Sequence, residues 1–322
     1  MVERYAIAPG APGNASRDQS RPDAIFKWLT AGCSMVVILI MAGILFELVR
    51  NSGMALKEFG FSFLTSDAWN PGMGEFGAAS SVYGTLVSTA IAMVIAVPLS
   101  IIIAVFLVEV ARPRVSRFIG GAIELLAAVP SIIYGMWGLF VFAALMQNHV
   151  QPFLGNRLGA LPLFQGPPMG IGMLTAGLIL ALMVLPFITA VTRDVLMMVP
   201  PVLKESAHGV GSTMWEAVRF VSLKYGRRGI VGAVFLGFGR ALGETMAVTF
   251  VIGNSHRISA SLFSAGNTIA SSLANEFNEA SEPIYLSSLF ALALVLFGIT
   301  LAFQTIAHHW VARMQRIEAG DR

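Results

Sequence analysis

The chain has 322 residues, of which 56% are hydrophobic and only 12% are charged. Its mean hydropathy is +0.73. Because a soluble domain carries about 25% charged residues, this composition excludes an ordinary soluble protein and indicates an integral membrane protein. The net charge of +3 carries little information as a total, since the placement of positive charge is what matters in a membrane protein. We therefore expect lipid as its surroundings and no nucleic-acid partner. The single cysteine, Cys33, allows no internal disulfide.

Six apolar segments are long enough to cross a bilayer, which takes roughly 20 residues. They are Ile25–Val49, about Val82–Val108, about Gly121–Leu145, about Ile171–Thr192, about Ile230–Ile252 and about Ile284–Ala307. The sequence thus predicts an all-α, six-span polytopic membrane helix bundle. Its expected parts are a mobile tail at 1–24, a transmembrane domain at 25–310 that includes a polar loop at about 193–228, and a second tail at 311–322.

The distribution of Lys and Arg between the two sides of the membrane predicts the orientation. Both tails and the two connections on their side hold sixteen, whereas the three opposite segments hold only Arg50, Lys57, Arg157 and Arg257. Positive residues accumulate in cytoplasmic loops. We therefore expect both termini to be cytoplasmic and the chain to be a multi-pass protein of the cell membrane.

The polar loop at 193–228 contains an apolar stripe with helical spacing, from Leu203 to Val221. Pro200 and Pro201 suit a helix start. Gly209 and Gly211 weaken the middle, so two short helices with a bend fit the pattern better than one long helix. The segment is either a docking surface for a cytoplasmic partner or an interfacial helix that lies on lipid.

This loop resembles the cytoplasmic loop of bacterial ABC-importer permeases, whose pattern is Glu-Ala-Ala, three residues, Gly, nine residues, Ile-x-Leu-Pro. The matching positions here are Glu205, Ser206, Ala207, Gly211, Val221 and Leu223. The chain departs from the pattern at Ser206, at Val221 and at Lys224, which replaces the final Pro, but it keeps the Glu-to-Gly spacing. Three further blocks, at 82–101, 128–142 and 239–248, are similar to the phosphate-specific permeases of the PstC family.

The resemblance implies a type I importer permease with a MetI-like core, whose loop at 193–228 couples it to an ATPase. The implied partners are a PstA-like sister permease, a PstB-like ATPase dimer, a PstS-like extracytoplasmic phosphate-binding protein and inorganic phosphate. None of the four lysines lies in a G-x-x-x-x-G-K-[ST] loop. We therefore expect this chain to be a transport subunit and not an enzyme. It would bind no cofactor, and the partner ATPase would use ATP and Mg²⁺.

Arg240 and Glu244 lie inside the fifth predicted span. Arg240 is expected near mid-membrane, where a charge costs at least about 2.5–3.5 kcal/mol, and Glu244 is expected one turn further on the same helix face. They are either a structural ion pair or a substrate pathway in which the arginine fork binds phosphate oxygens. Gly239 and Gly243 form a G-x-x-x-G step suited to helix packing.

Two other functions stay open on the sequence alone. One is a permease for a different oxyanion, and the other is a self-contained secondary anion transporter that uses Glu244 as a proton site. An intramembrane enzyme is disfavoured, because the spans contain no nucleophile–base pair and no metal-ligand cluster.

Overall fold

The computed structural model describes residues 20–320, with side chains from 23 to 313. The ends of the two predicted tails, residues 1–19 and 321–322, lie outside the described residues. The chain divides into two units at Arg50. The first unit holds α1 (Ser20–Asn51) except for its last residue. Because α1 starts at Ser20, the last residues of the expected N-terminal tail are helical.

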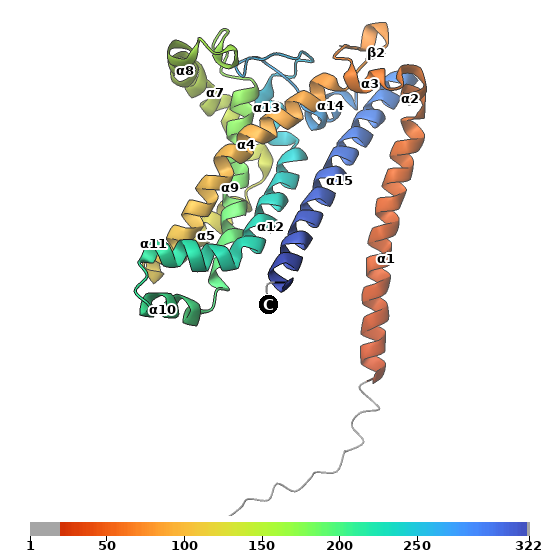
Figure 1. The fold of residues 1–322 in the computed structure, drawn as a ribbon. Helices are drawn as coiled ribbons and strands as arrows, with labels where there is room; N and C mark the ends of the chain where they lie inside the picture. The colour runs from red at the N-terminus through yellow and green to blue at the C-terminus, as the bar shows by residue number, and fades with distance from the viewer. Residues whose placement is uncertain (1–19, 321–322) are drawn as a thin grey trace, which may run out of the picture. The chain divides into compact units, whose positions relative to one another are not determined.

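The second unit is almost entirely helical (Figure 1). Its helices are α2 (Gly53–Phe59), α3 (Ser62–Thr65), α4 (Ala79–Val105), α5 (Pro113–Ala127), α6 (Ser131–Trp137), α7 (Ala143–Leu145), α8 (Gln151–Leu158), α9 (Met173–Met197), α10 (Pro201–Gly209), α11 (Met214–Ala217), α12 (Leu223–Leu242), α13 (Met246–Ile252), α14 (Ile269–Glu276) and α15 (Pro283–Gly320). Turns of π-helix extend or join several of them, at Phe106–Val110, Gly138–Phe142, Met146–Val150 and Val218–Ser222. Short 3-10 turns occur at Pro71–Met73 and Pro162–Phe164.

The predicted number of spans is confirmed if one bent pair counts as a single span. Five continuous helical segments are long and apolar enough to cross a membrane, namely Asp23–Asn51, Ala79–Val110, Ser131–Leu158, Met173–Met197 and Pro283–Arg313. The sixth candidate is Met214–Leu242 followed by Met246–Ile252, with a bend of 58° between the two.

The boundaries predicted for the third span, about Gly121–Leu145, are wrong. Helix α5 ends at Ala127, and Pro130 separates it from α6, because proline lacks an N–H and disfavours helical geometry in the residue before it. The helix then runs to Leu158 through polar residues that the sequence assigns to a loop. Gln151, the first residue of α8, is buried, and its Oε1 accepts a hydrogen bond from Gly170 N at 2.8 Å.

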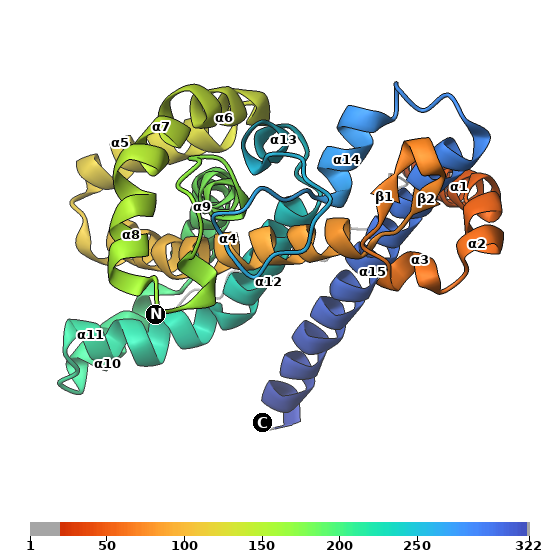
Figure 2. The same cartoon turned by 90° about the horizontal axis from the view of Figure 1, so that it is seen from above.

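Helix α9 is the centre of the bundle and contacts α4, α5, α12 and α13. Figure 2 shows it between α4 and the α6–α13 pair. Small residues let α4 and α9 approach closely. A Cβ on Gly177 would lie 2.6 Å from Ile91 Cγ2, and Ala92 and Ala96 are fully buried in the same core. This tight packing makes α4 and α9 a rigid frame.

Two departures from the predicted architecture lie outside the spans. Helix α15 continues to Gly320, so the segment predicted as a C-terminal tail at 311–322 is helical as far as it is described. A short antiparallel hairpin, β1 (Trp69–Asn70) with β2 (Glu75–Phe76), is a small addition to the all-α fold. Trp69 is opposite Phe76 and Asn70 is opposite Glu75.

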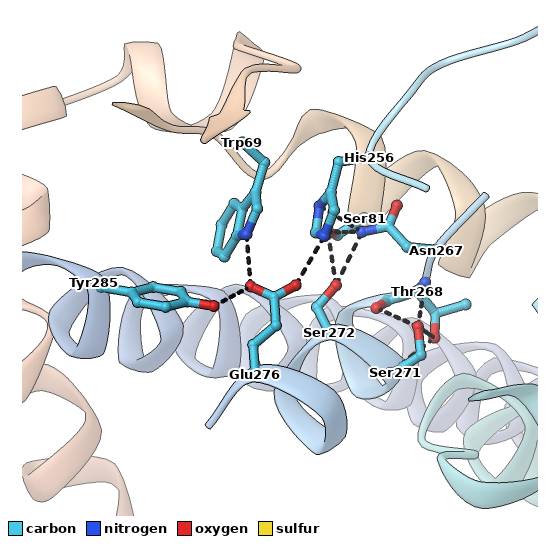
Figure 3. A network of polar contacts seen from close by, with 9 residues as sticks. All are labelled: Trp69, Ser81, His256, Asn267, Thr268, Ser271, Ser272, Glu276 and Tyr285. Carbon is cyan, nitrogen blue, oxygen red and sulfur yellow. Dashed lines mark hydrogen bonds and ion pairs between the residues drawn. The ribbon is translucent and has the colours of Figure 1, made fainter. Parts of the chain in front are cut away.

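A polar cluster, which we call the cap network, lies at the end of the bundle opposite α10 (Figures 1 and 3). Glu276, at the end of α14, accepts three hydrogen bonds. They come from Trp69 Nε1 at 2.6 Å, Tyr285 Oη at 2.7 Å and His256 Nε2 at 2.8 Å. The indole of Trp69 stacks on His256, with ring centroids 5.1 Å apart. One carboxylate therefore joins the β hairpin, the segment after α13, α14 and α15.

Asn267 extends the cap network to α4. Its Nδ2 donates to Ser81 Oγ at 2.7 Å and to Ser272 Oγ at 2.9 Å, and it lies 2.9 Å from His256 Nδ1. Burial raises the pKa of Glu276, but the hydrogen bonds from His256, Tyr285 and Trp69 together outweigh burial and hold that pKa below its usual range.

The lowered pKa gives a prediction for stability against pH. A carboxylate whose folded pKa is depressed contributes stability that is present above its ordinary value of 4.5. This contribution is lost as the pH falls through the folded value. We expect Glu276→Gln to lose about 1–3 kcal/mol at neutral pH and to flatten the acid limb of the thermal unfolding midpoint, measured in detergent from about pH 7 to pH 3.

Glu279→Gln is the matched control, because Glu279 lies three residues further on and is exposed. It should unfold like the wild type at every pH. An acid limb in Glu276→Gln as steep as in the wild type would contradict the assignment.

Candidate functional site

Arg240 lies in the last turn of α12, directly before a break in the fifth span. The helix ends at Leu242, residues 243–245 are not helical, and α13 leaves at 58°. The Arg240 side chain is exposed in this chain. Its guanidinium carbon lies 5.5 Å from the ring centroid of Phe187 on α9, a distance within the range of a cation–π contact. The arginine therefore sits at the edge of the core and is not enclosed by it.

Glu244 lies inside the break, so the prediction that it follows Arg240 by one turn on the same helix face is wrong. Its Oε1 accepts a hydrogen bond from Ala247 N at 3.2 Å and so caps the start of α13. In the part of the chain that the structure describes, no ion pair links Glu244 to Arg240. The two charges act on two different helix ends.

The break has a local cause that the sequence already contains. Gly243 is the C-cap residue of α12, and glycine commonly follows the end of a helix. A positive residue in the last turn and a negative one before the next helix each complement the dipole at that end. The sequence Arg-Ala-Leu-Gly-Glu thus contains a helix C-terminal signal followed by a helix N-terminal signal. A hydropathy plot does not reveal these signals, because the residues around them are apolar.

The two glycines beside the break have different surroundings. A Cβ on Gly239 would lie 2.7 Å from Gln304 Nε2 of α15, so Gly239 permits close packing of α12 on α15. Gly243 is exposed, and a Cβ placed on it would have Gly239 O as its nearest neighbour, at 3.8 Å. A packing role for Gly243 against a second subunit stays a prediction.

The connection predicted at 193–228 is shorter than expected, because α9 extends to Met197 and the helical run that leads into α12 already begins at Met214. Helix α10 begins at Pro201, as predicted, and the bend falls at Gly211, whose φ is +90°. This angle favours glycine. Thr213 then caps α11 through a reciprocal capping box with Glu216. The second helix is not short, since it continues through a π-helical turn into α12.

The matched loop residues lie on both sides of this bend. Glu205 and Ser206 are exposed on α10, and Ala207 is half-buried. Leu223 packs on the apolar cluster of Ala104, Leu196 and Ile230, whereas Val221 is half-buried. Several large apolar side chains around the bend are exposed, namely Val202, Leu203, Val210, Met214 and Trp215. We call this exposed set the coupling surface.

Two carboxylates near these helices are engaged in ion pairs that the sequence does not signal. Glu124 Oε1 on α5 lies 2.8 Å from Arg193 Nη1 on α9. Glu109 Oε1 lies 2.7 Å from Lys204 Nζ. Within the described residues, no group of three or more His, Cys, Asp or Glu is placed to hold a metal ion.

Comparison with known proteins places this geometry in a family. The model of the family described as "Binding-protein-dependent transport system inner membrane component" matches residues 96–316. The chain is 53% identical over 296 residues to "Phosphate transport system permease protein PstC" of Mesorhizobium japonicum. That alignment covers 91% of this chain and 90% of the relative.

Solved structures support the fold. A bacterial ABC transporter involved in the import of the acidic polysaccharide alginate has a chain that aligns with a TM-score of 0.61 at 15% identity, over 92% of this chain and 99% of its own. The MetNI methionine ABC transporter, in an inward-facing conformation, aligns with a TM-score of 0.50 at 18% identity, over 73% of this chain and 92% of its own. The fold is therefore the predicted MetI-like permease fold, and the chain belongs to the binding-protein-dependent transport-system inner-membrane components and, within them, to the PstC permeases of phosphate-specific transport.

Proposed function

We propose that this chain forms one half of the path by which inorganic phosphate crosses the membrane by alternating access. Arg240 binds the anion on that path. The observation that carries the proposal is the exposed guanidinium beside the broken span. A charge there cannot face hydrocarbon without a cost of several kcal/mol. The described residues leave the Arg240 side chain exposed, which suits a water-filled path shared with a second permease.

The chemistry of the site fits an oxyanion. A guanidinium presents a planar fork that makes bidentate, charge-assisted hydrogen bonds to phosphate oxygens. Because Glu244 caps α13, it does not neutralise Arg240 within this chain. In our proposal Glu244 keeps the break in place and repels the anion onward, and a role as proton acceptor from monobasic phosphate is compatible with that position.

The proposed assembly follows the family. The other half of the path comes from a PstA-like sister permease, the energy from a PstB-like ATPase dimer that uses ATP and Mg²⁺, and the phosphate from a PstS-like binding protein on the extracytoplasmic side. Both termini are proposed to be cytoplasmic. The coupling surface, with Glu205 and Ser206 beside it, is proposed to seat against the ATPase, because exposed apolar patches of this kind mark interaction sites.

A permease for a different oxyanion would use the same arginine. Uptake of arsenate and of sulfate must therefore be measured beside uptake of phosphate. A self-contained secondary transporter is less well supported, since the relatives are permeases of binding-protein-dependent systems.

The first prediction of this proposal concerns the two charges. Arg240→Gln, alone or together with Glu244→Gln, should assemble and fail to transport, because the anion then meets no positive charge. Hydrogen bonds to charged groups contribute about 1.5–3 kcal/mol each, so phosphate uptake should fall by at least about tenfold. Glu244→Gln keeps an acceptor for Ala247 N and should assemble as well as the wild type.

Arg157→Gln is the matched control, because Arg157 also lies in the last turn of a helix and over a phenylalanine ring, 5.7 Å from Phe153. It should transport normally. Uptake near the wild-type level in Arg240→Gln/Glu244→Gln would leave Arg240 with a structural role only.

The second prediction concerns the bend at Gly211. No atom would crowd a Cβ there, but its φ of +90° opposes any other residue, and forcing a left-handed conformation costs roughly 1–2 kcal/mol. Gly211→Val should therefore tilt α10 away from the ATPase and lower phosphate uptake per ATP hydrolysed, in a complex that still inserts. Glu205→Lys should weaken co-purification of the ATPase.

Gly209→Ala provides the control, since Gly209 is equally uncrowded but has no left-handed φ. It should couple normally. If Gly211→Val and Glu205→Lys both show wild-type transport and ATPase stimulation, the coupling surface lies elsewhere.

A further inference from the structure

We infer that Glu109 is a positioning residue that passes the movement of α10 to the spans α4 and α12. The inference rests on the proposed function and deepens it, because it names the contact through which the ATPase would act on the path. Glu109 lies in the π-helical turn Phe106–Val110 that ends the second span.

A single oxygen of Glu109 joins three elements. Its Oε1 accepts a hydrogen bond from Lys204 Nζ of α10 at 2.7 Å and another from Ser222 Oγ at 2.8 Å. Ser222 ends the π-helical turn from which α12 begins. The side chain of Glu109 is only 11% exposed and that of Lys204 23%, so this ion pair is screened less than one on the surface.

Helix α10 depends on polar contacts for its position, because none of its residues is buried. Hydrophobic packing therefore does little to tie it to the bundle. The ion pair from Lys204 to Glu109 links the middle of α10 to the π-helical turn that continues α4. A force on the exposed coupling surface would reach α4 through this contact and not only along the chain.

The layer next to Glu109 makes the contact stiff. Ala104 of α4, Leu196 of α9 and Ile230 of α12 form a buried cluster on which Leu223 packs. Ser222 and Leu223 are neighbours, so the hydrogen bond and the apolar contact hold the same end of α12. Arg240 lies eighteen residues further along this helix, about 27 Å at roughly 1.5 Å per residue.

Both ends of the contact also share an unusual backbone. Glu109 and Ser222 each lie in a turn of π-helix, a form that appears mostly as single-turn insertions and frequently at functional sites. Glu109 thereby makes α4 and α12 move together when α10 moves.

The test uses the whole complex of this chain with its sister permease, the ATPase and the binding protein. Glu109→Gln should assemble and keep basal ATP hydrolysis. The stimulation of hydrolysis by phosphate-loaded binding protein should fall by at least about fivefold, the lower end of coupling between distant sites. Lys204→Met, on the exposed helix, should show the same loss even if Glu109→Gln assembles poorly.

Charge reversal separates coupling from simple stability. In Glu109→Lys/Lys204→Glu the pair is restored, and a hydroxyl at Ser222 accepts from the new lysine, so stimulation should recover above that of either single variant. Glu124→Gln is the matched control, because it removes an ion pair of similar length, 2.8 Å, that joins α5 to α9 and does not involve α10. It should leave stimulation unchanged.

Normal stimulation in both Glu109→Gln and Lys204→Met would overturn the inference. So would an equal loss in Glu124→Gln, or a charge-reversed variant no better than the single ones. A wild-type complex that takes up no phosphate would overturn the proposed function as well, and this result is distinct from the others because it needs no variant.

Discussion

The cost of placing a charge and a broken backbone in a membrane is the constraint on which the rest of the structure depends. An arginine within a span costs at least about 2.5–3.5 kcal/mol. A broken backbone adds to this cost unless its N–H and C=O groups find partners, and here Gly243 N donates to Gly239 O and Glu244 N donates to Ala241 O, both at 3.4 Å. The guanidinium carbon of Arg240 lies 5.5 Å from the centroid of the Phe187 ring, and the side chain is otherwise exposed in the described part of the chain. An exposed arginine beside a broken span is the feature on which our proposal of a water-filled path, shared with a second permease, rests.

The break also explains how two opposite charges share a short segment without pairing. Arg240 complements the negative end of α12, and Glu244 caps the positive end of α13. Each charge stabilises the helix end next to it. Arg240 thereby keeps a guanidinium that is available to an anion, which an internal ion pair would have consumed.

The frame around this break is rigid at its centre and loosely held at α10. The α4–α9 core is closely packed through Ala92, Ala96 and Gly177. In contrast, α10 buries no residue and reaches the bundle through Lys204 and Glu109. A movable element attached by a polar contact to a stiff helix can transmit motion without deforming the core.

Much of this arrangement is predictable from the sequence, because it depends on local signals. The number of spans follows from long apolar runs, and the start of α10 and the bend at Gly211 follow from proline and glycine. The third span is misplaced because Pro130 ends a helix within an apolar run, and because the contact of Gln151 with Gly170 is not local. The helix break at Gly243 can be predicted from the glycine and the charges beside it, but not from hydropathy alone.

The full sets of partners of Glu109 and Glu276 could not be predicted, since each carboxylate joins at least one residue about a hundred or more positions away in the sequence. Lys204 and Ser222 follow Glu109 by 95 and 113 positions in the sequence, and Trp69 precedes Glu276 by 207 positions. Only the folded chain brings these groups together, and the spacing of residues within one helix does not predict such contacts between helices.

The central claim, that the break lines a water-filled path, is tested most directly by thiol labelling at the break itself. Thr245→Cys would be introduced into a Cys33→Ser background, because Cys33 is the only native cysteine. Labelling by a small charged reagent would be measured in the assembled complex, from each side of the membrane and with and without nucleotide. The account predicts labelling from opposite sides in the two nucleotide states, and slower labelling when phosphate is present. A cysteine that reacts from neither side in any state would contradict it.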